Sequence, residues 1–166
     1  MSRKIVIGVM GPGEHAKDID IQNAYEIGKR IALEGWVLLT GGRNIGVMEA
    51  ANQGAKAANG LTIGILPGKT EDGISEAVDI AIFTDMGNAR NNINILSTDV
   101  VIACGMGAGT ASEIALALKA GKKVILLSDD EESQVFFQKM SPGNVYVVCD
   151  VENAIATIHT ILELRF

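Results

Sequence analysis

Residues 99–120 read DVVIACGMGAGTASEIALALKA and indicate how this part of the chain folds. The apolar run 99–104 is typical of a buried parallel strand, and the run from Ile114 to Ala120 has the periodicity of an amphipathic helix. The glycine-rich segment 105–113, GMGAGTASE, makes the turn between them. Such a turn leaves backbone N–H groups free at the positive end of the helix dipole, where phosphate binds well. The alternative is a tight turn that only needs glycine at positive φ.

The residues of this turn are therefore candidates for binding an anion. We predict that they are Gly105, Met106, Gly107, Ala108, Gly109 and Thr110, the last through its hydroxyl group. Glu113 stands one turn into the helix, where a carboxylate repels a phosphate. It must therefore cap the helix or act on another part of the ligand.

Two other predicted strands also end in glycine-rich turns. The strand 36–40 is followed by GGRNIG (41–46) and a helix, and the strand 5–10 by GPGE (11–14). In an open parallel sheet, ligands bind outside the carboxyl ends of the strands, where the winding reverses. We therefore expect the three turns to converge on one crevice. The candidates they add are Thr40, Gly41, Gly42 and Arg43 from one turn, and Gly11, Gly13 and Glu14 from the other.

Each of these turns also has a simpler interpretation. The turn 41–46 could be a helix-entry turn with a solvated Arg43. The turn 11–14 could be a glycine–proline turn followed by an exposed His15. A further polar cluster, GNARNNIN (87–94), lies between a strand and a short helix. There Asn88 and Arg90 are candidates, because arginine gives bidentate hydrogen bonds to phosphate or carboxylate. In the simpler interpretation Asn88 is an N-cap and Arg90 a surface residue.

Strand-like and helix-like runs alternate along the whole chain, which predicts an α/β fold. We expect a single Rossmann-like domain (1–166), with a doubly wound, mostly parallel sheet of about seven strands and helices on both faces. The predicted strands are 4–10, 36–40, 61–66, 80–83, 99–103, 123–127 and 145–148. The predicted helices are 18–34, 47–58, 89–96, 111–120, 131–140 and 151–164. Residues 67–77 are expected to form a loop, because Pro67, Gly68 and Gly73 interrupt them.

Composition and motifs exclude several classes of function. The net charge of −6 without a basic cluster argues against a nucleic-acid partner. No apolar run approaches the ~18 residues of a membrane span, and no signal peptide is evident, so we expect a cytoplasmic protein without a membrane partner. Cys104 and Cys149 are expected to be reduced structural thiols, and no metal site is expected. No Walker A motif or serine nucleophile elbow occurs, and His159 is expected to be structural.

The segments GGRNIGVMEAANQGA (41–55), GNARNNINILSTDVVIACG (87–105) and GMGAGTASEIALAL (105–118) resemble the superfamily of the LOG (LONELY GUY) phosphoribohydrolases. That superfamily has a glycine-pair segment ending in Gly-x-Met, an arginine before a helix, and a PGGxGTxxE motif. Here the Pro-Gly of the motif is Gly105-Met106, and the Arg90 segment lacks the His and Lys usual in active LOG enzymes. With its GPGE turn and GMGxGTxxE variant, the chain looks more like the molybdenum cofactor carrier proteins within this superfamily.

This resemblance implies a non-catalytic carrier that binds, protects and transfers molybdenum cofactor, a molybdopterin with one phosphate tail. The expected ligand is thus a small phosphorylated pterin, with a molybdoenzyme as acceptor and a homo-oligomer, dimer or tetramer, as the assembly. The alternative from the same superfamily is a phosphoribohydrolase that releases free base and ribose 5-phosphate from a nucleoside 5′-monophosphate. In that case Arg90 and Glu113 would be catalytic. Otherwise no catalytic residue is expected.

Overall fold

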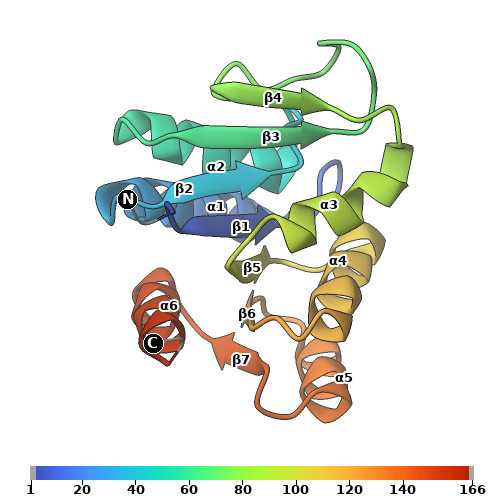
Figure 1. Ribbon diagram of the computed structural model, residues 1–166. Coiled ribbons are helices and arrows are strands. Elements are labelled where there is room, and N and C mark those ends of the chain that lie inside the picture. Colours follow the sequence, from blue (N-terminus) through green and yellow to red (C-terminus); the bar gives the residue numbers. More distant parts are fainter. Residues whose placement is uncertain (1–2, 165–166) are drawn as a thin grey trace.

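The computed structural model describes residues 3–164 and contains one sheet of seven parallel strands (Figure 1). The predicted α/β, doubly wound Rossmann-like fold is confirmed. The strands are β1 (Val6–Met10), β2 (Val37–Thr40), β3 (Thr62–Leu66), β4 (Ile80–Phe83), β5 (Val100–Cys104), β6 (Val124–Leu127) and β7 (Val145–Val148). The helices are α1 (Asp18–Leu33), α2 (Gly46–Ala57), the 3-10 turn η1 (Gly87–Ala89), α3 (Arg90–Leu96), α4 (Ala108–Lys119), α5 (Glu131–Met140) and α6 (Val151–Glu163).

The strand order β4-β3-β2-β1-β5-β6-β7 places the first strand in the middle of the sheet. The chain winds outward from β1 to β4, then returns through α3 to β5 and winds outward on the other side. The winding thus reverses between β1 and β5, which are paired in parallel from Ile7–Val100 to Met10–Ala103. Ligands of open α/β sheets bind in the crevice that such a reversal leaves at the carboxyl ends of the strands.

Helices cover both faces of the sheet (Figure 1). Helices α1, α2 and α6 share one apolar core with the sheet, in which Ile27, Ala51 and Ile158 are buried. Helices α3, α4 and α5 share the second core, through Ile95, Ile114 and Phe137. Central strands are apolar on both faces for this reason, as the continuous run from Val100 to Cys104 illustrates.

Helices α1 and α2 pack unusually closely because two glycines face the opposite backbone. A Cβ atom on Gly28 would lie 2.0 Å from the carbonyl oxygen of Ala51, and one on Gly54 would lie 1.9 Å from that of Tyr25. Neither glycine has a positive φ, so close approach rather than backbone conformation requires them. This contact holds α2, and with it the turn that precedes α2, against the first strand and helix.

The predicted elements occur within a few residues of their expected bounds, with two informative differences. Helix α4 begins at Ala108 with Gly107 as its N-cap, three residues earlier than predicted. The 87–96 segment starts with a 3-10 turn before it becomes helical. Residues 67–77 form the predicted loop, which pairs with the turn after β2 through an Arg43–Ile74 bridge. No helix among residues 3–164 is long and apolar enough to cross a membrane.

Candidate functional site

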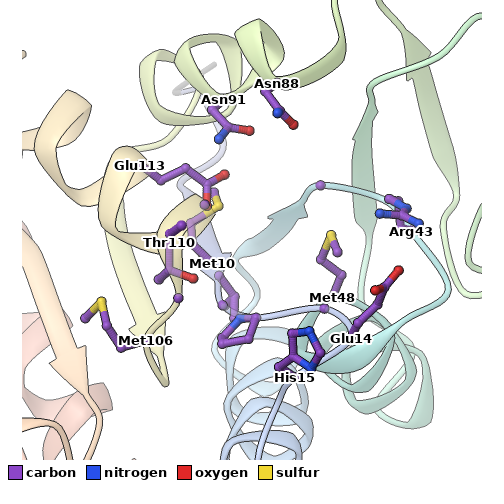
Figure 2. Close-up of a pocket in the computed structure, with 18 of the residues that line it drawn as sticks. Met10, Glu14, His15, Arg43, Met48, Asn88, Asn91, Met106, Thr110 and Glu113 are labelled. Carbon is purple, nitrogen blue, oxygen red and sulfur yellow. The ribbon is translucent and has the colours of Figure 1, made fainter.

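A cavity of about 340 Å³ lies at the carboxyl ends of β1, β2 and β5, beside the reversal point of the sheet (Figure 2). Ligand sites in proteins typically have about 300–1,000 Å³. The segments that line it are far apart in the sequence. They contribute Val9, Met10, Gly11, Pro12, Gly13, Glu14, His15, Gly41, Arg43, Met48, Asn88, Arg90, Asn91, Met106, Gly107, Ala108, Gly109, Thr110 and Glu113.

The first turn of α4 supplies hydrogen-bond donors to this cavity. The N-cap residue Gly107 has no side chain to cap the helix, and the first intrahelical bond runs from the amide of Ala111 to the carbonyl of Gly107. The amides of Ala108, Gly109 and Thr110 precede that bond and point out of the helix end. We call these three amides, together with Oγ1 of Thr110, the α4 cradle. They lie at the positive end of the helix dipole, which favours an anion.

The Thr110 hydroxyl is a buried donor of the α4 cradle that the described part of the protein leaves unpaired. Thr110 is only 2% exposed, and its Oγ1 has no hydrogen-bond partner among the described residues. In Figure 2 the side chain points from α4 toward the cavity. Buried hydroxyl groups are normally paired, because desolvation without a partner costs about 1–3 kcal/mol. A ligand oxygen in the cavity would supply the missing partner.

Arg90 reaches the same cavity from α3. Its Nη1 donates to Oδ1 of Asn91 at 2.7 Å, and its Nη2 donates to the carbonyl of Gly41 at 3.4 Å. Gly41 makes this approach possible, since a Cβ there would lie 2.9 Å from Nη2. Nε is buried and has no partner in the part of the chain that the structure describes. The guanidinium is therefore fixed by two hydrogen bonds and keeps N–H donors for a ligand.

The charge of Arg90 is poorly solvated. Burial lowers the pKa of its guanidinium, the nearby Glu113 carboxylate raises it, and Arg43 lowers it again. Two guanidinium groups near one cavity repel each other in the free protein. An anion between them would relieve that repulsion, because opposite charge stabilises the protonated form. The charge distribution thus favours an anionic ligand although the whole chain is acidic.

Glu113 is the buried acid of the site, with 7% of its surface exposed. Burial raises its pKa to about 7, while a hydrogen bond from Asn94 and the charge of Arg90 pull it down. The carboxyl group faces the cavity one helical turn beyond Thr110 (Figure 2). It does not cap α4, whose N-cap interaction involves no side chain. Of the two roles expected for Glu113, capping of α4 is not observed, and action on a ligand stays a prediction.

A polar seam of buried asparagines joins α3 to α4. Nδ2 of Asn91 donates to Oγ of Ser112 at 3.1 Å, and Oγ of Ser112 donates to the carbonyl of Gly109 at 2.7 Å. One turn further along, Nδ2 of Asn94 donates to Oε1 of Glu113 at 3.0 Å. These bonds fix the helix that carries Arg90 against the first turn of α4.

The opposite wall comes from the turns after β1 and β2. Glu14, His15 and Arg43 are exposed side chains there, and Met10 and Met48 provide apolar surface between the two walls (Figure 2). The Arg43 turn is held by the 67–77 loop, since the amide of Asn44 donates to the carbonyl of Gly73 at 2.9 Å. The cavity therefore has a wall rich in hydrogen-bond donors at α4, and Arg43 provides a second cationic group on the other side of an apolar floor.

The structure brings all predicted site residues to this cavity except Thr40, Gly42 and Gly105. Thr40 is fully buried, and its Oγ1 accepts from the amide of Gly42 at 3.0 Å and donates to Asn52 at 3.1 Å. Gly42 and Gly105 have φ values of +76°, and both face other parts of the protein rather than the cavity. These three residues shape the turns. Their expected place in the pocket wall is not observed.

The simpler interpretations of two residues are wrong. Arg90 is 9% exposed rather than a surface residue, and the N-cap of α3 is Ala89 rather than Asn88.

His159 is structural as expected, with Nε2 3.0 Å from Glu34 and its ring against Trp36. Cys104 is buried, whereas Cys149 is exposed, and both are free thiols. No group of His, Cys, Asp or Glu within residues 3–164 is arranged to hold a metal ion.

Several lining residues were not among the predicted site residues. Asn91 lies next to Arg90 in the same polar cluster, so its position in the GNARN segment is a usable signal. Met10 and Met48 gave no such signal, because an apolar side chain at a strand end or in a helix is indistinguishable from a core residue. Only the packing of the turns shows that they face the cavity.

Comparison with known proteins gives one consistent group of relatives. The model of the SLOG cluster4 family matches residues 4–155. The molybdenum cofactor binding protein of the phototrophic bacterium Rippkaea orientalis is 62% identical with a TM-score of 0.96, over 98% of this chain and 99% of that one. The Moco carrier protein of Chlamydomonas reinhardtii is 53% identical with a TM-score of 0.91, over 97% and 99% of the two chains.

A relative with an enzymatic name is more distant. The cytokinin riboside 5′-monophosphate phosphoribohydrolase of Mycobacterium tuberculosis is 31% identical over 102 residues, which are 60% of this chain and 54% of that protein. The resemblance to molybdenum cofactor carrier proteins within the LOG-like superfamily, based on the GMGAGT and GNARN segments, is confirmed by these comparisons.

Proposed function

This chain belongs to the SLOG cluster4 family, and from that premise we propose that it binds molybdenum cofactor and carries it without consuming it. The relatives that match nearly the whole chain at 62% and 53% identity are a molybdenum cofactor binding protein and a Moco carrier protein. Molybdopterin has one phosphate group at the end of a flat pterin system. The cavity offers matching surfaces for both parts.

The observation that carries this proposal is the unpaired, buried Oγ1 of Thr110 in the α4 cradle. A phosphate in the α4 cradle accepts hydrogen bonds from this hydroxyl and from the amides of Ala108 to Thr110. Charge-assisted bonds of this kind are about twice as strong as neutral ones. Arg90, which is already fixed by Asn91 and Gly41, adds a positive charge close by.

The apolar floor suits the other part of the ligand. Met48 lies between the α4 wall and Arg43, where a flat ring can pack against its thioether group, and Met10, which is 2% exposed, supports this floor from the core. Residues that recognise the phosphate through backbone amides need no conformational change and no covalent step. The ligand therefore leaves unchanged, which is what transfer to an acceptor requires.

Titration calorimetry of the purified protein with molybdenum cofactor tests this proposal. We expect saturable binding that weakens at least tenfold in Arg90→Ala. The matched control is Arg30→Ala, because Arg30 pairs with Glu152 far from the cavity lining. Wild-type protein that fails to bind the cofactor, or Arg90→Ala that binds it as tightly as wild type, contradicts the proposal.

A second candidate function is N-glycosidic cleavage of a nucleoside 5′-monophosphate. The observation that favours it is the buried Glu113 facing Arg90 in the cavity, since a carboxylate can stabilise positive charge that develops on a ribose. The phosphoribohydrolase of Mycobacterium tuberculosis is the relative that points the same way. Release of free base from AMP by wild-type protein, lost in Glu113→Gln, supports the enzyme. No release supports a carrier without catalytic activity.

The acceptor and the assembly belong to the same proposal. We infer a cytoplasmic homo-oligomer, dimer or tetramer, that passes the cofactor to a molybdoenzyme. Exposed apolar side chains such as Met86, Leu96 and Phe136 offer surface for contacts with other chains. Light scattering at several protein concentrations tests the assembly. Cofactor-dependent activation of an apo-molybdoenzyme by the loaded protein tests the transfer.

A further inference from the structure

Glu113 and Asn94 form a buried acid–amide pair beside the α4 cradle. Nδ2 of Asn94 donates to Oε1 of Glu113 at 3.0 Å, and Asn94 is fully buried. The other end of the amide, Oδ1 of Asn94, is buried without a hydrogen-bond partner among residues 3–164. An ionised carboxylate can only accept hydrogen bonds, so it leaves this oxygen unpaired. A protonated carboxyl group has one O–H donor and can pair with it.

The charged groups around Glu113 do not favour a permanent carboxylate. Arg90 approaches from α3 and lowers the pKa of Glu113, but burial has the larger effect and raises this pKa to about 7. Arg43, Glu14 and His15 line the same cavity from the turns after β2 and β1. Thr110, which carries the unpaired hydroxyl of the α4 cradle, is one helical turn from Glu113 on the same helix.

We propose that Glu113 is held as a neutral carboxylic acid by reciprocal hydrogen bonds with Asn94, and that its ionisation releases an anionic ligand from the neighbouring α4 cradle. The inference rests on the proposed function, because it concerns the phosphate end of the same ligand. Asn94 is a positioning residue in this account, and Glu113 is the group whose charge decides how tightly the anion is held.

The step is a proton transfer and changes no covalent bond of the ligand. On release, the carboxyl group of Glu113 gives its proton to solvent and remains as a carboxylate. At pH values above the pKa of about 7, where Glu113 of the free protein is ionised, the carboxylate takes a proton from solvent on binding. Up to one proton then enters the protein for each anion bound. The carboxylate and a phosphate dianion repel each other across a poorly solvated cavity, where charge interactions are stronger than in water.

The first experiment is titration calorimetry with molybdenum cofactor at pH 7, 8 and 9 for wild type and Glu113→Gln. A phosphate monoester is mainly dianionic over this range, because its second pKa is about 6. We expect the wild-type affinity to approach a tenfold fall for each pH unit, and the affinity of Glu113→Gln to stay constant. The variant His15→Gln is the control for the histidine of the wall, and it should retain the wild-type slope.

The second experiment needs no ligand. Infrared difference spectra of the free protein should show a protonated carboxyl C=O band that disappears as the pH rises through about 7, and that Glu113→Gln lacks. Asn94→Ala should move the midpoint of this band to lower pH, because it removes the oxygen that accepts from the protonated acid. An unchanged midpoint, or a move to higher pH as expected if Asn94 mainly stabilises the carboxylate, contradicts this role of Asn94.

The outcomes separate the two proposals. If the cofactor binds with the same affinity at every pH, or the C=O band is absent, the proton-coupled release is wrong and the carrier function stands. If neither wild type nor Glu113→Gln binds the cofactor at any pH, the carrier function is wrong, and the infrared titration alone decides the state of Glu113.

Discussion

The unpaired hydroxyl of Thr110 destabilises the folded protein, and a ligand that pairs with it would explain why it is there. Its buried Oγ1 lacks a partner in the protein chain over the described residues. We predict that Thr110→Val raises the melting temperature, since relief of an unpaired hydroxyl is worth about 1–3 kcal/mol and each kcal/mol shifts Tm by about 2–4 °C. The same variant should bind molybdenum cofactor about tenfold more weakly. Thermal unfolding and titration calorimetry measure the two effects.

Thr62→Val is the matched control, because Thr62 is also fully buried but its Oγ1 donates to the carbonyl of Ala77 at 2.6 Å. It lies outside the cavity lining, so it should lower Tm and leave the affinity unchanged. A Thr110→Val protein that is less stable than wild type and binds the cofactor normally would show that the hydroxyl serves the fold alone.

Glu113 makes the stability of the protein depend on pH in a predictable direction. Its pKa is raised from the ordinary 4.5 to about 7 in the folded state. Between these values the unfolded chain ionises while the folded protein keeps the proton, so the free energy of unfolding falls as the pH rises. We expect wild type to lose on the order of 3 kcal/mol relative to Glu113→Gln between pH 4.5 and 7.5. Urea unfolding of both proteins across this range is the measurement, and parallel curves contradict the assignment.

At the level of single residues, the sequence is informative where the chemistry is unusual. Arg90 and Glu113 stand out as charged residues that follow predicted strands at the start of helices, and both reach the cavity. The prediction that Thr40 lines the cavity was wrong. In the sequence, a threonine at a strand end is the same whether its hydroxyl contacts a ligand or, as here, Gly42 and Asn52. The contacts of a short polar side chain depend on tertiary packing, which periodicity does not describe.

Helix α4 begins without a side-chain cap. Gly107 occupies the N-cap position with extended backbone (φ −164°), which any residue can adopt, and a Cβ there would make only an ordinary contact of 3.6 Å with Pro12. The Cβ that Gly107→Asp adds therefore fits without strain, and the new carboxylate is at the position of a helix cap. We predict that this variant is at least as stable as wild type and binds molybdenum cofactor more than tenfold more weakly, because the carboxylate competes for the α4 cradle.

The control for this prediction is Gly107→Ala, which adds the Cβ without the carboxylate. Chemical unfolding and titration calorimetry on the three proteins separate the two contributions. If Gly107→Asp keeps the wild-type affinity, the phosphate does not sit on the amides of α4.

The close packing of helices α1 and α2 also positions the site, because it holds the turn that precedes α2. A Cβ on Gly54 meets the Tyr25 carbonyl oxygen at 1.9 Å, so the helices must separate in Gly54→Ala. Alanine favours an isolated helix over glycine by about 1 kcal/mol, yet we expect a net loss of about 1–3 kcal/mol from overpacking. Gly68→Ala is the control, since no atom lies within 4 Å of the added Cβ. Unchanged stability of Gly54→Ala in urea would contradict this packing.

The elements themselves were largely predictable, because buried parallel strands and amphipathic helices have distinct apolar patterns. The start of α4 was not. The glycines at 107 and 109 are typical of a turn, but Gly109 is helical here, and the preference of glycine for turns is outweighed by the contacts of the helix with β5 and α3. This difference matters, because it places the amides of Ala108 to Thr110 at the helix end.

The strand order of the sheet determines where the site lies. The reversal between β1 and β5 brings the turns after β1, β2 and β5 to one edge of the sheet, so residues near positions 12, 42, 90 and 110 meet around one cavity. The convergence of these turns could be predicted from the alternation of strands and helices. The inward orientation of Met10 and Met48 and the asparagine seam of α3 and α4 could not, because both depend on how the helices pack.

The net charge of −6 does not prevent this molecule from binding an anion. Exposed carboxylates are screened over about 10 Å in ordinary salt, whereas the amides of α4 and the guanidinium of Arg90 act at contact distance in a poorly solvated cavity. The fold thus brings two guanidinium groups and the amides of α4 to one cavity of an acidic protein, beside the carboxyl groups of Glu14 and Glu113. That arrangement favours a compact anionic ligand over a nucleic acid.

The central claim is that the phosphate of molybdenum cofactor binds at the N-terminus of α4, and a crystal structure of the complex tests it most directly. We predict that the phosphate oxygens lie within hydrogen-bond distance of the amides of Gly109 and Thr110 and of Oγ1 of Thr110, with the pterin over Met48. A cofactor bound with its phosphate at another surface, and with the Thr110 hydroxyl still unpaired, would contradict the account.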